Sequence, residues 1–192
     1  MKTTIFKISF IFLLLSLMGA GCVKEDEDEF ELQIDDKSAV IQKEVDGVEF
    51  KFCLLNENGE PATVFREGEN FTFQFSITNN TGVLLYNDSR FLDKNIFNVY
   101  DIKNIDYGKP YELTFIMKIG QGANPLAVGS PYTLIVPWKD NRESWNSLYY
   151  SFKGLSKDLL PKGKYFTQFS HQFSLGSIKT DELTFKINFE IK

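Results

Sequence analysis

Several segments of this chain alternate between apolar and polar residues with a period of two. The pattern is plain in Val48–Leu54, Phe71–Thr78 and Leu183–Ile191, and Tyr165–Leu175 follows the same parity. In such a segment one set of side chains faces a core and the other faces water, as in antiparallel sheets that are buried on one face. The alternation therefore predicts an all-β chain.

Turn residues separate these segments and set their spacing. Asn, Gly and Pro gather at 56–61, 67–70, 79–82 and 161–163, and residues of these types favour tight turns. Further strands are expected at Ala39–Glu44, Gly82–Tyr86, Ile96–Ile102, Glu112–Ile119 and Tyr132–Trp138. Short strands at this spacing predict an antiparallel β-sandwich, built as one domain from residues 38–192. Two segments, Asp140–Ser147 and Lys153–Leu159, have weak helical patterns.

Phenylalanine is abundant, with 19 residues in the chain. Most of them fall on the inward parity of a predicted strand, where burial of each aromatic side chain contributes about 1.5–3 kcal/mol. We therefore interpret the phenylalanines as core residues and not as the lining of a ligand cavity.

The first 21 residues have the composition of a secretory signal. Lys2 and Lys7 precede the apolar run Ile8–Met18, and small residues follow at Gly19–Gly21. The run of 11 residues is shorter than the roughly 20 residues that a membrane-spanning helix needs. This pattern predicts a signal peptide over residues 1–21 that is removed from the mature protein.

Cys22 directly follows the small residues, and Gly19-Ala20-Gly21-Cys22 resembles the lipobox of bacterial lipoproteins. Gly19 stands where the lipobox has a large aliphatic residue. The resemblance implies that Cys22 carries a diacylglyceryl group and a palmitate-type acyl chain, which together anchor the protein in a membrane. The alternative is an ordinary secreted protein that is cut near Gly21. Cys53 lies in an apolar strand, where we expect a buried and inert thiol.

Residues 22–37 form a predicted acidic tether. Eight of the fifteen residues after Cys22 are Asp or Glu, whereas residues 38–192 contain 17 basic and 18 acidic residues. Such a segment repels itself and cannot bury apolar surface. The run Lys24–Glu29 resembles the export signal of lipoproteins on the outer face of some Gram-negative cells, which implies an outer-membrane protein exposed on the cell surface. The alternative is a spacer on a protein that faces the periplasm. A nearly neutral domain lacks the basic face of a nucleic-acid binder.

Two other segments resemble immunoglobulin-like bacterial domains. In Phe65–Gly82 a Gly-Glu turn leads into an alternating strand, and Leu159–Tyr165 contains a Pro-x-Gly-x-Tyr sequence. The resemblance implies an immunoglobulin-like sandwich, in which the Tyr165 hydroxyl bonds back to the backbone as in a tyrosine corner. This fold carries many unrelated functions, so the resemblance predicts architecture only.

The residues that usually perform catalysis are sparse. His171 is the single histidine, and its parity places it with Phe169 and Phe173 toward the core or a sheet edge. With one histidine and one cysteine besides Cys22, the common zinc ligand sets cannot be assembled. Asn87–Ser89 and Asp93–Asn95 lack a calcium-loop spacing, and Gly120-Gln121-Gly122 lacks the lysine of a phosphate-binding loop. We therefore expect a protein that is not an enzyme and binds neither a metal nor a cofactor.

The segment Trp138–Phe152 is the best candidate for binding. It contains both tryptophans and two tyrosines, together with Asn, Asp and Arg. This mixture suits a sugar or a protein partner, so the candidate binding residues are Trp138, Trp145, Tyr149 and Tyr150. The alternative is a crossing segment whose rings close the open end of the sandwich.

The sequence therefore predicts a monomeric, non-catalytic binding or structural module that contacts the membrane only through its lipid and engages an extracellular glycan or protein. One alternative is an immunoglobulin-like protease inhibitor that uses a rigid loop at Ile119–Ser130. Another is a fimbrial or adhesin-type subunit that assembles by strand exchange.

Overall fold

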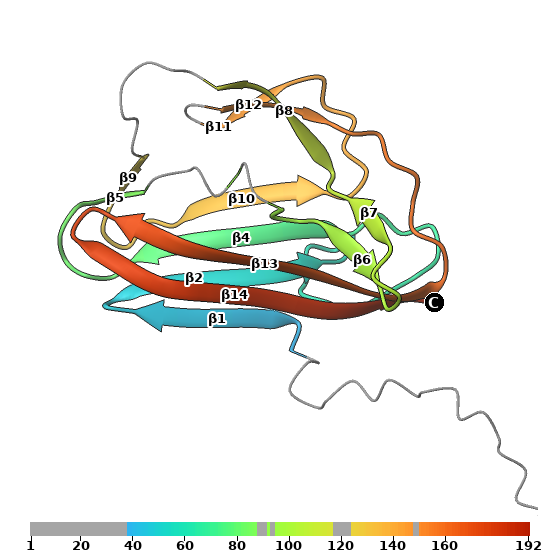
Figure 1. Cartoon of the computed structure of the whole chain (residues 1–192), viewed down its shortest axis with the longest axis horizontal. Coiled ribbons are helices and arrows are strands. Elements are labelled where there is room, and N and C mark those ends of the chain that lie inside the picture. The colour runs from blue at the N-terminus through green and yellow to red at the C-terminus, as the bar shows by residue number, and fades with distance from the viewer. Residues whose placement is uncertain (1–37, 88–91, 93–94, 117–123, 148–149) are drawn as a thin grey trace, which may run out of the picture. The chain divides into compact units, whose positions relative to one another are not determined.

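The computed structural model describes residues 38–87, 92, 95–116, 124–147 and 150–192. The predicted signal peptide, Cys22 and the acidic tether lie outside these residues. Within the described ranges the chain forms fourteen β-strands and no α-helix (Figure 1). The all-β prediction is therefore confirmed. No helix among the described residues has the length and hydropathy needed to cross a membrane.

The strands form three sheets. Sheet A has the order β1-β2-β4-β10, with β1 at Val40–Val45, β2 at Val48–Leu55, β4 at Thr72–Asn79 and β10 at Tyr132–Pro137. All neighbours in sheet A are antiparallel.

Sheet B has the order β3-β14-β13-β5-β9. Its bounds are Val64–Phe65 for β3, Ile178–Ile191 for β14, Gly163–Leu175 for β13, Leu85–Asn87 for β5 and Asn124–Leu126 for β9. Two further strands, β6 (Val99–Asp101) and β7 (Asp106–Gly108), form a hairpin in which β6 pairs with β13. The β3–β14 pair is parallel, whereas the long β13–β14 pair is antiparallel.

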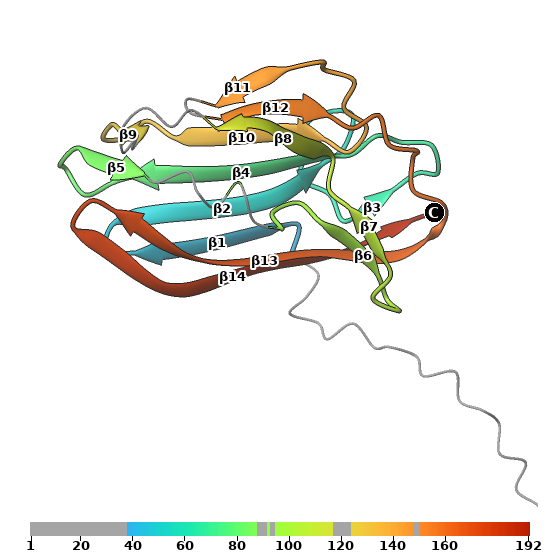
Figure 2. The same cartoon turned by 45° about the horizontal axis from the view of Figure 1, so that its top comes forward.

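Sheet C is smaller. It contains β8 (Tyr111–Ile116), β12 (Tyr150–Gly154) and β11 (Trp145–Ser147), with β12 in the centre. The helical pattern predicted for Asp140–Ser147 and Lys153–Leu159 is wrong, because these segments contain the strand β11, the end of β12 and irregular backbone. Figure 2 draws β8, β11 and β12 toward the top of the view, on the side of sheet A where β10 lies.

Sheets A and B pack face to face through aromatic side chains. Phe52 of β2 contacts the edge of the Phe169 ring at 5.4 Å between centroids, and Phe75 of β4 contacts Phe185 of β14 in the same way at 5.5 Å. Phe50 meets Phe173 at 4.6 Å. Aromatic pairs in tilted and edge-to-face arrangements contribute energy beyond their buried area. The phenylalanines on the inward parity of these strands therefore form the core between the two layers, as the alternation predicted.

Two tight turns join the longest hairpins. Asp46 and Gly47 have positive φ angles of 49° and 77° and connect Val45 to Val48, which pair directly. Two positive φ angles in a two-residue loop match the right-handed twist of the flanking strands. In the second turn, two residues lie between Leu175 of β13 and Ile178 of β14, which pair directly. The first of these two residues is Gly176, with a φ of 69°.

The predicted strand at Ile96–Ile102 is shorter in the structure, where β6 covers only Val99–Asp101. Phe97 interrupts it with a φ of 67°, which is rare for a bulky side chain. Its ring is fully buried and stacks on Phe73 at 4.8 Å. Burial of this ring in the core accounts for the unusual backbone at the start of β6.

The predicted bond from Tyr165 is present. Its hydroxyl donates to the Pro161 carbonyl oxygen at 2.8 Å, and its ring stacks on Phe189 at 5.6 Å. Burial, the neighbouring Tyr107 and Asp101 raise the pKa of Tyr165 to about 12. This bond fixes the entry to β13, the strand on which the candidate site is built.

Candidate functional site

Trp138, the first residue of the predicted binding segment, lies in the core. Its side chain is 2% exposed, its ring stacks on Phe71 at 5.9 Å, and its Nε1 donates to the Asp158 carbonyl oxygen at 2.9 Å. The Lys157 ammonium lies 5.1 Å from the ring centroid. The Trp138 ring is therefore not available to a ligand at the surface.

Trp145 is half-buried on sheet C. Its ring stacks on Phe152 at 4.2 Å, and the Arg142 guanidinium lies 4.7 Å from the ring centroid. Tyr149 lies outside the described residues, and Tyr150 is described only as backbone in β12. Of the four predicted rings, Trp145 is thus the one that the structure places near the surface.

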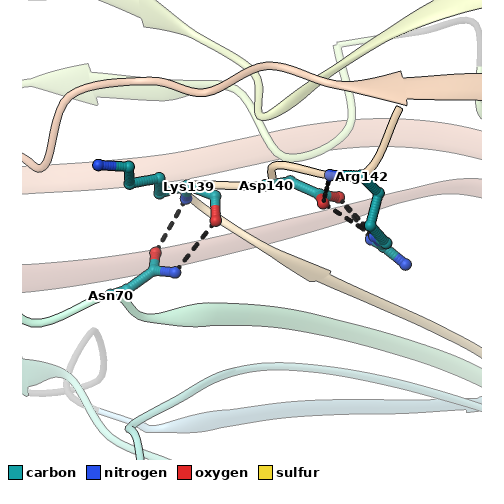
Figure 3. A network of polar contacts seen from close by, with 4 residues as sticks. All are labelled: Asn70, Lys139, Asp140 and Arg142. Atoms are coloured by element: carbon teal, nitrogen blue, oxygen red, sulfur yellow. Dashed lines mark hydrogen bonds and ion pairs between the residues drawn. The ribbon is translucent and has the colours of Figure 1, made fainter. Parts of the chain in front are cut away.

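A polar network anchors the segment that precedes Trp145 (Figure 3). Asp140 is 2% exposed, and its carboxylate accepts bonds from the Arg142 backbone N at 3.0 Å and from Nε at 2.8 and 2.9 Å. Asn70 joins the segment to the start of β4, because its side-chain amide exchanges two bonds with the backbone of Lys139 at 2.9 and 3.1 Å. The Asp140 carboxylate and the Arg142 guanidinium neutralise each other. The network is therefore a structural clamp, which holds residues 139–142 against the start of β4.

A groove of about 650 Å³ lies on the solvent side of β13, beside β6. Its size falls within the range of small-molecule sites, about 300–1,000 Å³. Phe166 of β13 pairs with Tyr100 of β6, and their rings stack at 5.3 Å with an interplanar angle of 22°. Both side chains are half-buried. The groove therefore has an aromatic pair on one side.

Amide and hydroxyl groups supply the rest of the lining. Asn95, Asn104, Gln168 and Ser170 line the groove together with the aromatic pair and Phe169. The Ser170 hydroxyl also shares a hydrogen bond of 2.7 Å with Thr184 on β14. None of these lining residues is ionisable at neutral pH. Lys186, whose ammonium lies 5.2 Å from the Phe166 centroid, stands beside the aromatic pair and is not part of the lining.

The register between β6 and β13 explains why these side chains meet. Phe166 and Gln168 occupy the outward parity of β13, because Tyr165, Thr167 and Phe169 are buried. The pairing of Thr167 with Val99 brings the outward face of β6 alongside. Side chains on one face of neighbouring strands stand about 5 Å apart. The groove thus depends on the contact between β6 and β13.

Asn104 reaches the groove from the turn of the β6–β7 hairpin. It adopts a φ of 61°, a conformation that asparagine tolerates better than most residues. The Asp101 side chain holds this turn, because its Oδ1 accepts the backbone N–H groups of Lys103 and Ile105, each at 2.8 Å. Ile102 and Ile105 are 51% and 54% exposed on either side of Asn104. The turn is therefore defined by hydrogen bonds and not by burial.

Asn98 connects the elements beneath the groove. It is 6% exposed, and its Nδ2 lies 3.2 Å from the Tyr100 hydroxyl and 3.3 Å from each carboxylate oxygen of Asp106. Its backbone N donates to the Asn95 carbonyl oxygen at 3.3 Å. One buried amide thus contacts both strands of the hairpin and a lining residue.

A second cavity, of about 620 Å³, lies near β3. Glu57, Glu67 and Glu69 line it together with Arg66 and Lys192. Glu69 caps local backbone, because its carboxylate accepts the Arg66 N–H at 2.8 Å, and Glu67 pairs with Lys162 at 3.4 Å. The carboxylates of Glu67 and Glu69 thus already have partners, so the cavity is a weaker candidate than the groove.

The residues considered for catalysis and metal binding are not gathered in one place. Over the part of the chain that the structure describes, no group of three or more His, Cys, Asp or Glu side chains could hold a metal ion. His171 is half-buried on β13, with its ring 4.8 Å from Phe173. Cys53 is 1% exposed; burial raises the pKa of its thiol, and Lys51 opposes this shift.

The predicted inhibitor loop at Ile119–Ser130 is described only from residue 124 onward. In that part, Asn124–Leu126 form β9, which pairs with β5, and Leu126 is 1% exposed. Three of the seven described residues of the segment thus belong to sheet B, and Ala127–Ser130 lie outside the strand.

Sequence reasoning missed the groove, although one signal was present. Phe166 lies on the outward parity of a strand whose inward positions include Tyr165 and Phe169. An aromatic side chain at a solvent-facing position of a strand can be a sign of binding. Tyr100 and the asparagines gave no comparable signal, because their place beside Phe166 follows from strand pairing.

Comparison with known proteins does not assign this chain to a family: no family model, no curated protein and no solved structure matches it.

Proposed function

We propose that this chain is a non-catalytic, lipid-anchored module of the bacterial cell envelope, and that it binds a glycan in the groove beside β6 and β13. The stacked pair of Tyr100 and Phe166, surrounded by amide side chains, is the observation that supports this function.

The chemistry of the groove suits a sugar. A sugar ring has an apolar face of C–H groups and a rim of hydroxyl groups. Aromatic side chains offer apolar area with little loss of side-chain entropy. The amides of Asn95, Asn104 and Gln168 each offer donors and an acceptor to hydroxyl groups. Because the lining residues that the structure describes are uncharged, the expected ligand is a neutral glycan.

An immunoglobulin-like arrangement of the strands is part of the proposal. Immunoglobulin domains place strands A, B, E and D in one sheet and C, F and G in the other. The order β2-β4-β10 corresponds to A-B-E, and the antiparallel neighbours β6-β13-β14 correspond to C-F-G. In this correspondence the groove lies on the outer face of strands C and F, and sheet C is an addition to the sandwich.

The anchor and location rest on the sequence. The lipobox-like segment ending at Cys22 supports lipidation, and the acidic residues 23–37 support a tether that projects the domain from the outer membrane. Metabolic labelling with an alkyne analogue of palmitate should mark the protein, and Cys22→Ser should abolish the label. Protease treatment of intact cells should remove the domain if it is displayed on the surface and spare it if it faces the periplasm.

A glycan array probed with the purified protein tests the binding function. We expect binding to neutral oligosaccharides, with about a tenfold loss of affinity for Phe166→Ala and for Tyr100→Ala, equivalent to about 1.4 kcal/mol. Tyr86→Ala is the matched control, because Tyr86 is an aromatic residue that is 46% exposed on β5. No binding to any glycan, or equal losses for the control and the groove variants, would refute the proposal.

The two alternative functions have their own tests. A protease inhibitor should slow at least one protease in a panel at micromolar concentration. A fimbrial or adhesin-type subunit should polymerise by strand exchange, so sedimentation of a single monomeric species would count against it.

A further inference from the structure

We infer that Asn98 is the positioning residue of the proposed glycan groove: it holds the Tyr100 ring in place beside Phe166, and it ties this ring to the β6–β7 hairpin. The inference rests on the proposed function, because it assigns a role at the same site. Asn98 does not line the groove, and it acts through Tyr100.

The contacts of Asn98 all lead to groove elements. Its Nδ2 lies 3.2 Å from the Tyr100 hydroxyl and 3.3 Å from both carboxylate oxygens of Asp106, so its two amide hydrogens serve the ring and the neighbouring strand at once. Its backbone N donates to the Asn95 carbonyl oxygen at 3.3 Å. The side chain is 6% exposed, and water therefore competes little for these bonds.

Asp106 transmits this restraint to β7. Its Oδ1 accepts the Gly108 backbone N–H at 2.6 Å, and the β6–β7 register shifts between Val99 and Tyr100. A register shift interrupts the regular ladder and re-aims side chains. The Asn98–Asp106 contact spans this irregular point, so it fixes the hairpin where backbone pairing is interrupted.

Among the described residues, two charged side chains act on the Asn98 amide, one directly and one through its neighbour. Asp106 is the carboxylate bonded to it, and Lys157 is coupled to Asp106 in turn: burial lowers the pKa of Lys157, and the attraction of Asp106 raises it. On β13, the position opposite Asn98 is occupied by the neutral Gln168, next to the paired Thr167. The local environment is therefore dominated by one carboxylate.

Preorganisation explains why a buried amide affects affinity. A ring that is fixed before binding does not lose rotational freedom when the sugar stacks on it, and this loss normally weakens binding. Removal of the Asn98 amide should therefore weaken binding by about threefold to tenfold without removing any group that touches the ligand.

A double-mutant cycle on the full-length protein, purified in detergent micelles, tests this role. The probes are neutral hexasaccharides of glucose, mannose, xylose and N-acetylglucosamine, with affinities measured by calorimetry. Asn98→Ala and Tyr100→Phe should each weaken binding, and the double variant should be no weaker than the more affected single variant, because both remove the same contact. If the affinity losses of the two single variants multiply in the double variant, Asn98 acts independently of Tyr100 and the inference is overturned.

Asn98→Asp supplies a readout that a general structural role would not change. It places a second carboxylate about 3.3 Å from that of Asp106. At pH 8 both groups are ionised and repel each other, whereas in mild acid they share one proton. Affinity of this variant should therefore rise from pH 8 to pH 5, while the affinity of the wild type stays flat. An equal pH profile for both proteins would contradict the inference.

A measurement without ligand separates the two proposals. In NMR spectra of protein labelled on tyrosine side chains, three-bond couplings should show a single χ1 rotamer for Tyr100 and averaged rotamers in Asn98→Ala. Averaged rotamers of Tyr100 in the wild type overturn the positioning role, even if glycans bind. If the wild type binds none of the hexasaccharides and no glycan on the array, the proposed function is refuted, and the inference with it.

Discussion

Gly154 lies against Asp140 so closely that a Cβ atom at position 154 would be 2.5 Å from the Asp140 carbonyl oxygen and 2.7 Å from its Cγ. The Gly154 backbone N also donates to the Arg142 carbonyl oxygen at 2.9 Å. The end of β12 therefore fits under the Asp140–Arg142 clamp only because residue 154 has no side chain.

Gly154→Ala should destabilise the protein by about 2 kcal/mol or more, because the clash is with backbone and cannot be relieved by a side-chain rotation. Gly59→Ala is the control. Gly59 has open space around it and a φ of 78°, so its cost should be that of the backbone conformation alone, about 1 kcal/mol. Urea denaturation of the two variants measures the difference. Equal losses would show that the close approach to Asp140 is not a constraint.

Asp140→Asn should cost about 1–3 kcal/mol of unfolding free energy, because it weakens the bonds to Arg142 around a buried group. Glu112→Gln is the matched control: its ion pair with Lys153 measures 3.7 Å, and both side chains are more than half exposed. An exposed pair of this kind contributes little. Thermal unfolding should separate the two variants, and a control as unstable as Asp140→Asn would contradict the clamp.

Tyr165→Phe removes the bond to Pro161 and should cost about 1 kcal/mol at neutral pH. Because the folded-state pKa of Tyr165 is about 12 and an unfolded tyrosine titrates near 10, the stability that depends on its proton is complete below pH 10 and is lost toward pH 12. The difference between wild type and variant should therefore shrink over this interval. Denaturation at pH 8, 10 and 11 checks this, and a constant difference would refute it.

Cys53 should resist thiol reagents in the folded protein. Its side chain is 1% exposed, and burial raises the pKa of the thiol, so both access and thiolate population are low. Labelling with iodoacetamide should proceed in denaturant and not in its absence. The Cys22→Ser background isolates this thiol, and rapid labelling of the native protein would contradict the burial.

The long strands of sheets A and B were predictable because they are buried on one face. In β2, β4, β13 and β14 the alternation of Phe with polar residues directly records which side faces the core. The turn at Pro161 and the bond from Tyr165 were predictable for a related reason, since both partners lie within four positions of each other. Local geometry and side-chain parity carry this information.

The failures concern relationships between distant residues. Trp138 shares the inward parity of Leu134 and Val136, which are also buried, so a local signal of its burial was present. Its contacts are distant in sequence, however, with Phe71 on its ring and Asp158 on its nitrogen. The segments 140–147 and 153–159 have weak helical periodicity, but pairing of β11 and β12 with β8 overrides it. The groove depends on the register between β6 and β13, and register over such a separation is set by the whole core.

The parallel pairing of β3 with β14 has a consequence for the order of events during synthesis. Glu190 and Ile191 pair with Val64 and Phe65, so a strand that is synthesised early, β3, pairs with the strand that is synthesised last, β14. Before Ile178 has been synthesised, both β3 and β13 lack β14, the strand with which they pair. Contacts between residues so distant in the sequence form slowly. The nascent polypeptide consequently cannot complete sheet B until β14 has emerged from the ribosome.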